Sequence, residues 1–138
     1  MQKRGQTDCG GGGYMYIGAT LFREQISGDM RSFIGEHICS FTKLDIIRFF
    51  GLNPASRLDS ETLLEISGDN RAEIDDSLAQ LVKSHLLDPV KVDSKTFYEM
   101  TNDKGEQDKI KKFIALYSKP SARLLIIGHV MNQRVEKT

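Results

Sequence analysis

The stretch from Asp59 to Met100 constrains the fold most, because it contains two helix signals in close succession and then a hairpin signal. Asp59 can cap a first helix, and Gly68 ends that helix because glycine tolerates the left-handed backbone found at helix ends. Asn70 and Glu73 then form a capping box at the start of a second helix. The pattern predicts two helices joined by a tight turn.

A β-hairpin is expected directly after the second helix. His85 lies where that helix ends, a position often held by glycine. The runs Leu87–Val92 and Thr96–Met100 are β-prone, and Asp93-Ser94-Lys95 between them suits a hairpin loop.

Helical patterns also precede this stretch. The region from Ala19 to Ile38 has apolar residues at helical spacing but contains two glycines, so it predicts one kinked helix or two short helices. A further helix is expected to begin with Thr42 as its cap and to stop near Gly51-Leu52-Asn53-Pro54.

Two more helices are predicted after the hairpin. Asp103 and Glu106 form another capping box, followed by an apolar stripe that ends at Tyr117. Pro120 interrupts the chain, and a final helix is expected from about Ser121 to Arg134.

The order of these elements predicts a mostly α fold with a small β-hairpin wing, a winged helix-turn-helix with extra N- and C-terminal helices. From about Phe41 to Tyr117, the chain resembles small bacterial and archaeal winged-helix transcription regulators of the MarR-like or ArsR-like kind. The expected organisation is a flexible Gly-rich tail (1–18), an N-terminal helical extension (19–40), a winged-helix domain (41–102) and C-terminal helices that dimerise (103–138).

The apolar positions of the predicted helices indicate one core. The residues expected to form it share helical faces and are Ile47, Leu64, Ile74, Leu78, Leu81 and Leu86.

Composition narrows the functional classes. The formal net charge is zero and the pI is about 6.8, which indicates neither a nucleic acid nor a membrane as a partner. Cys9 and Cys39 are the only cysteines, so no disulfide framework is implied and the cytoplasm is the expected compartment. No apolar run approaches the roughly twenty residues of a membrane span, so we expect no membrane partner.

The sequence contains no recognisable catalytic or metal motif. His37, His85 and His129 belong to no CxxC or HExxH pattern, and His37 with Cys39 is too small a ligand set. The glycines at 10–13 are not followed by the Lys-Ser or Lys-Thr pair of a phosphate loop. We therefore expect neither an enzyme nor a cofactor nor a metal.

The resemblance implies that the second helix of the motif enters the major groove of double-stranded DNA. The residues then expected to contact base edges or phosphates are Asn70, Arg71 and Gln80 on that helix and Lys91 and Lys95 on the wing.

Charge argues against this interpretation and keeps an alternative open. Leu58–Asp88 contains eight acidic and two basic residues, a formal charge of −6. Asp75 and Asp76 have no capping role, and an acidic surface weakens binding to phosphates. The alternative is a winged helix that binds a protein partner and no DNA. A small-molecule sensor has no distinctive residues to support it.

The flanking helices predict a homodimer, because one small core should not bury all their apolar stripes. The expected contacts are Phe22, Ile26, Phe33, Phe113, Tyr117, Leu124 and Ile127.

Overall fold

The computed structural model of the chain describes residues 17–68 and 70–137, and side chains within 21–68 and 70–133. Residues 1–16 of the predicted flexible tail lie outside the described residues, while residues 17 and 18 belong to the first helix. The elements are α1 (Ile17–Gln25), α2 (Gly28–His37), α3 (Phe41–Leu52), β1 (Arg57–Leu58), α4 (Ser60–Ser67), α5 (Arg71–Lys83), β2 (Leu87–Val92), β3 (Lys95–Met100), α6 (Lys104–Tyr117) and α7 (Pro120–Lys137).

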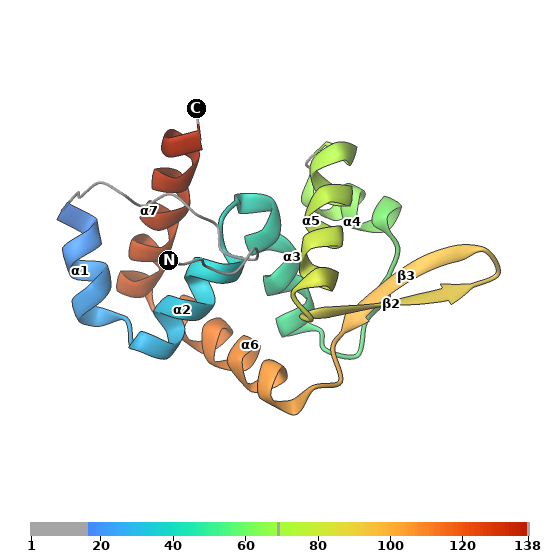
Figure 1. The fold of residues 1–138 in the computed structure, drawn as a ribbon, viewed down its shortest axis with the longest axis horizontal. Helices are drawn as coiled ribbons and strands as arrows, with labels where there is room; N and C mark the ends of the chain where they lie inside the picture. The colour runs from blue at the N-terminus through green and yellow to red at the C-terminus, as the bar shows by residue number, and fades with distance from the viewer. Residues whose placement is uncertain (1–16, 69, 138) are drawn as a thin grey trace, which may run out of the picture.

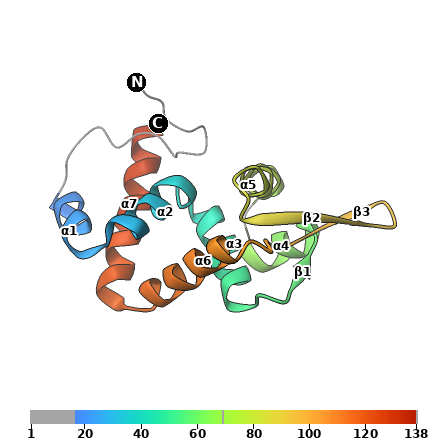
Figure 2. The same ribbon diagram turned by 60° about the horizontal axis from the view of Figure 1, so that its bottom comes forward.

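The helix-turn-helix and the wing occupy one end of the molecule, and the terminal helices occupy the other (Figure 1). Helices α4 and α5 pack on α3, and the β2–β3 hairpin projects away from them. Helix α6 leads from the sheet back to α7, which packs against α1 (Figure 2). The sheet is antiparallel with the order β1-β3-β2. This arrangement confirms the predicted winged helix-turn-helix with extra helices at both ends.

Side-chain caps fix most helix starts. Asp59, Asn70 and Asp103 each accept a hydrogen bond from the backbone N–H three residues later, which is the cap that the sequence predicted. The return bonds of the two capping boxes are replaced by others: the Asp103 N–H donates to Oγ1 of Thr101, and the Glu73 carboxylate accepts from Thr42. The predicted Thr42 cap is wrong, because Ser40 accepts from the Lys43 N–H and α3 begins earlier.

Thr42 has a different role. Its side chain is buried, and its hydroxyl donates to a carboxylate oxygen of Glu73 at 3.1 Å. This hydrogen bond joins the first turn of α3 to the first turn of α5.

Of the two alternatives for residues 19–38, the structure has two short helices. Ser27 separates α1 from α2 and caps α2 by accepting from the Met30 N–H at 3.3 Å.

The wing turn is tighter than predicted. Val92 pairs with Lys95, so the loop consists of Asp93 and Ser94 alone and Lys95 is the first residue of β3. Both loop residues have positive φ values, 51° and 69°, as a two-residue type I′ hairpin turn requires. His85 at the end of α5 also has a positive φ of 71°, and it occupies the glycine-like position that the sequence indicated.

The predicted core is confirmed except at one position. Ile47, Ile74, Leu78, Leu81 and Leu86 are all buried in one cluster. Leu64 is only partly buried, and its neighbour Leu63 takes the core position at 2% exposure. Two adjacent leucines leave the inward face of a short helix ambiguous, and the packing of α4 on α3 decides it.

The flanking helices join the same core. Ile26, Phe33, Phe113 and Tyr117, four of the seven residues expected at a dimer contact, are buried within one chain. Gly51 permits close packing of α3 on α6, because an added Cβ would lie 2.5 Å from Cγ1 of Ile114. These contacts leave Leu124 exposed and Phe22 and Ile127 partly buried.

Two histidines are part of this interior. His37 is 4% exposed and packs against Phe33, and burial, followed by the charges of Lys43 and Lys109, lowers its pKa from 6.5 to about 4. Nε2 of His37 lies 3.5 Å from a Glu36 carboxylate, but that carboxylate is half exposed and screened, so the cost of burying charge dominates. Burial also lowers the pKa of His129, which stacks on Phe22.

We predict that Leu63→Ala lowers the free energy of unfolding by roughly 2–5 kcal/mol, because it leaves a cavity in the core. Leu64→Ala should cost clearly less, since its side chain already contacts solvent. Urea denaturation of both variants tests the assignment, and equal losses, or a larger loss for Leu64→Ala, would contradict it.

We also predict that the protein loses stability as the pH falls from 6.5 to about 4. The pKa of His37 is lower in the folded than in the unfolded chain, so unfolding takes up a proton in this window. The full contribution of His37 is present above pH 6.5 and decreases by on the order of 3 kcal/mol by pH 4. Urea denaturation at several pH values measures it. His37→Gln should flatten the profile, and an unchanged slope in His37→Gln would refute the assignment.

Candidate nucleic-acid interface

One face of α5 is exposed next to the wing. Asn70, Arg71, Asp75, Asp76 and Gln80 all lie on it and are exposed; we call this set the recognition-helix face. The opposite face of α5 is buried against α3 and is formed by Ile74, Ser77, Leu78 and Leu81. Because this side of α5 is buried, the α5 residues that the sequence predicted as DNA contacts are exposed to solvent.

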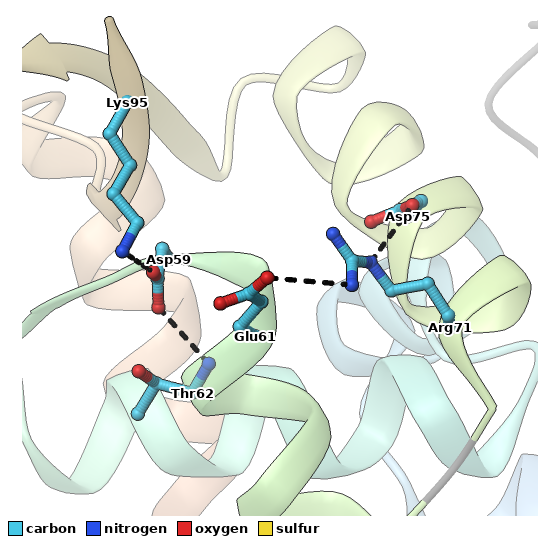
Figure 3. Close-up of polar contacts among 6 residues, drawn as sticks. All are labelled: Asp59, Glu61, Thr62, Arg71, Asp75 and Lys95. Carbon is cyan, nitrogen blue, oxygen red and sulfur yellow. Dashed lines mark hydrogen bonds and ion pairs between the residues drawn. The ribbon is translucent and has the colours of Figure 1, made fainter.

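Arg71 is placed at the start of α5 and is held by carboxylates. Its Nε lies 3.4 Å from Oδ2 of Asp75 and its Nη1 lies 3.9 Å from Oε2 of Glu61 on α4 (Figure 3). All three side chains are at least half exposed. Exposed pairs of this kind contribute little stability, but they neutralise the guanidinium locally.

The two amide side chains of this face also have partners on α5. Gln80 donates from Nε2 to Oδ2 of Asp76 at 2.8 Å, and Asn70 accepts from the Glu73 N–H at 2.8 Å. Each polar residue predicted to read base edges thus already has a partner within the chain.

The wing lysine Lys95 does not extend freely into solvent. Its Nζ lies 2.9 Å from Oδ2 of Asp59, whose side chain is only 9% exposed. Oδ1 of the same carboxylate accepts from the Thr62 N–H at 3.0 Å and caps α4 (Figure 3). The hydrogen bond from Thr62, and next the one from Lys95, hold the pKa of Asp59 well below its usual value, and Asp59 in turn raises the pKa of Lys95.

The other cations near the wing differ in how they are paired. Arg57 on β1 forms an ion pair with Glu99 on β3, with Nη2 at 3.0 Å from the carboxylate. Lys91 on β2 is exposed and forms no ion pair with any residue that the structure describes. Lys91 is thus the wing cation that is most available to a phosphate.

No local sequence pattern indicates that Asp59 and Glu61 pair with the candidate DNA contacts Lys95 and Arg71. Asp59 was recognisable as a helix cap, but its distance to Lys95 depends on the sheet: β1 pairs with β3 and brings the start of α4 beside the wing. A single sequence carries no local signal for that contact.

The side chains that the structure describes, within residues 21–68 and 70–133, include no group of three His, Cys, Asp or Glu that could hold a metal ion. Within the same ranges, no helix is long and apolar enough to cross a membrane. Cys39 is buried and accepts a hydrogen bond from Nζ of Lys43 at 3.4 Å.

Comparison with known proteins supports the fold. No protein-family model and no curated protein matches the chain. Among solved structures, HlyU from Vibrio cholerae is similar, with a TM-score of 0.54 over 69% of this chain and 99% of HlyU. The two sequences are 15% identical, so the similarity establishes a shared winged-helix fold and no more.

Proposed function

We propose that the protein is a cytoplasmic DNA-binding transcription regulator of the winged-helix superfamily, MarR-like or ArsR-like, that acts as a homodimer. The observation that supports this most is the exposed recognition-helix face beside a projecting two-stranded wing, within a fold shared with HlyU. An α-helix fits the major groove of B-form DNA, and a wing beside it can contact the flanking backbone.

The proposed contacts follow from the exposed side chains. Arg71 and Gln80 contact base edges or nearby phosphates, with Asn70 beside them at the start of α5. Lys91 contacts the backbone next to the wing, and Lys95 lies close to it. Asp75 and Asp76 then point away from phosphates or accept from cytosine amino groups, the base contact that suits a carboxylate.

One observation favours a second candidate function, binding of a protein partner. Arg71, Arg57 and Lys95 are each paired with a carboxylate of the same chain, and Leu58–Asp88, which contains Arg71, has a formal charge of −6. Such a surface attracts DNA weakly, because neutralising phosphates requires available cations.

The proposed dimer uses the outer surface of the terminal helices. Leu124 and Met131 on α7 are 71% and 55% exposed and lie two turns apart on one side of the helix. Leu21 on the adjacent α1 is 40% exposed. Of the contacts expected from the sequence, Leu124, Ile127 and Phe22 can still reach a partner, while the four buried residues act within one chain.

We predict that Asp75→Asn/Asp76→Asn binds mixed-sequence duplex DNA more tightly than the wild type, because two carboxylates no longer repel phosphates. Lys91→Ala should weaken binding and lower the salt slope by about one. Fluorescence anisotropy at two salt concentrations measures both effects. Asp103→Asn/Asp108→Asn on α6 makes the same change in net charge elsewhere and should have little effect. If the wild type shows no salt-dependent binding and the double variant gains none, the protein-partner function replaces this one.

We predict that the protein sediments as a dimer at micromolar concentration and that Leu124→Glu shifts it to a monomer. A charge at this position would have to be buried in the interface, which is costly. Ile66→Glu is the matched control, since Ile66 is 54% exposed but lies on α4 in the helix-turn-helix. A monomeric wild type, or a dimer dissociated by Ile66→Glu and not by Leu124→Glu, would contradict this interface.

A further inference from the structure

We propose that Asp59 withholds the wing lysine Lys95 from the DNA backbone and thereby lowers the affinity of the protein for DNA of any sequence. Asp59 is a positioning residue in this proposal, since it acts through Lys95. The proposal rests on the DNA-binding function proposed above and adds a restraint on that function built into the same surface.

Strands β1 and β3 together position the ion pair between Asp59 and Lys95. Asp59 directly follows β1, which pairs with Tyr98 and Glu99 of β3. Because the pairing is antiparallel, the segment that follows Leu58 continues alongside β3 in the direction of Lys95, the first residue of that strand. Along β3, the side chains of Lys95 and Phe97 lie on one side of the strand and that of Tyr98 lies on the other. Nζ of Lys95 lies 5.9 Å from the centre of the Phe97 ring. This register brings the ammonium within 2.9 Å of the carboxylate (Figure 3).

Asp59 differs from the carboxylates around Arg71 in its burial. Glu61 and Asp75 are more than half exposed and lie at 3.9 Å and 3.4 Å from Arg71, so water screens those pairs and a ligand can replace them. Asp59 is 9% exposed, and its second oxygen is already used by the Thr62 N–H. Moving Lys95 to a phosphate would leave the Asp59 carboxylate without the ammonium that lies 2.9 Å from it, which is unfavourable. A phosphate must therefore compete with Asp59 for this lysine.

The consequence for DNA follows from counterion release. A lysine adds to non-specific affinity when it neutralises a phosphate. Lys95 is already neutralised by its own chain, so in the wild type Lys91 supplies the phosphate contact of the wing. Removing the charge of Asp59 should make Lys95 a second phosphate contact.

The capping and ion-pairing roles of Asp59 can be separated by mutation. Asparagine caps helices about as well as aspartate, because its side-chain oxygen also accepts from the N–H at the third helical position. Asp59→Asn thus keeps the hydrogen bond to Thr62 and removes the charge that holds Lys95. Asp103→Asn is the matched control: Asp103 caps α6 in the same way, accepting from Glu106 at 3.0 Å, and makes the same change in net charge.

The test compares binding of a mixed-sequence duplex by the full-length wild type and variants in fluorescence anisotropy. Asp59→Asn should bind roughly five- to tenfold more tightly at about 0.1 M salt, with a salt slope steeper by about one. Asp59→Asn/Lys95→Ala should return to near wild-type affinity, and Asp103→Asn should stay there. If Asp59→Asn matches Asp103→Asn, or if the double variant stays as tight as Asp59→Asn, the proposal is overturned.

A second measurement examines the pair without DNA. NMR of ¹³C-dimethylated lysines, with the Lys95 signal assigned through Lys95→Ala, should show Lys95 titrating at higher pH in the wild type than in Asp59→Asn. Identical titrations would overturn the proposal whatever the DNA result. A clear difference, together with no salt-dependent DNA binding by any variant, would show that the pair exists and that the DNA-binding function is wrong. If Asp59→Asn fails to fold, Asp59→Ser also retains a capping oxygen and replaces it in both measurements.

Discussion

The structure depends on the burial of α3 on nearly all sides. Leu44, Ile46, Ile47 and Phe50 are each at most 3% exposed, and they point in different directions around this one helix. Helices α4, α5 and α6 and strand β3 all contact it. A helix with apolar residues on most of its sides is enclosed by other elements, so α3 contacts the helix-turn-helix, the sheet and α6 together.

Enclosure of α3 also explains why the flanking helices belong to the same core. Helices α3 and α6 approach each other closely at Gly51, and Phe113 of α6 contacts Phe33 of α2, with ring centres 5.5 Å apart. The inner faces of the terminal helices are therefore buried within one chain. Leu124 is one of the apolar residues on these helices that remain exposed.

Features with local signals could be predicted from the sequence, and features set by long-range contacts could not. The caps at Asp59, Asn70 and Asp103 depend on residues three apart, and the hairpin depends on a two-strand pattern around a turn. By contrast, β1 has only two residues and forms because β3 is already in place. The choice between Leu63 and Leu64 and the partner of Lys95 depend in the same way on neighbours far along the chain. The exposed positions of α5 followed from helical period, but the carboxylates that pair with them did not.

In the DNA-binding function proposed above, the pairing of the cations affects selectivity between DNA sequences. Non-specific affinity for DNA comes from phosphate contacts, while discrimination comes from base edges. An ammonium held by a buried carboxylate contributes little to non-specific affinity. Arg71, held only by exposed carboxylates, can exchange them for two acceptors on a guanine, because a bidentate contact offers the guanidinium better geometry than either separate pair. On a DNA-binding winged helix, such a surface lowers the affinity for all duplexes, because few cations are available to phosphates. The affinity gained from base contacts at a specific site is preserved, so the ratio of specific to non-specific binding rises. The formal charge of −6 on Leu58–Asp88 is compatible with this kind of selectivity.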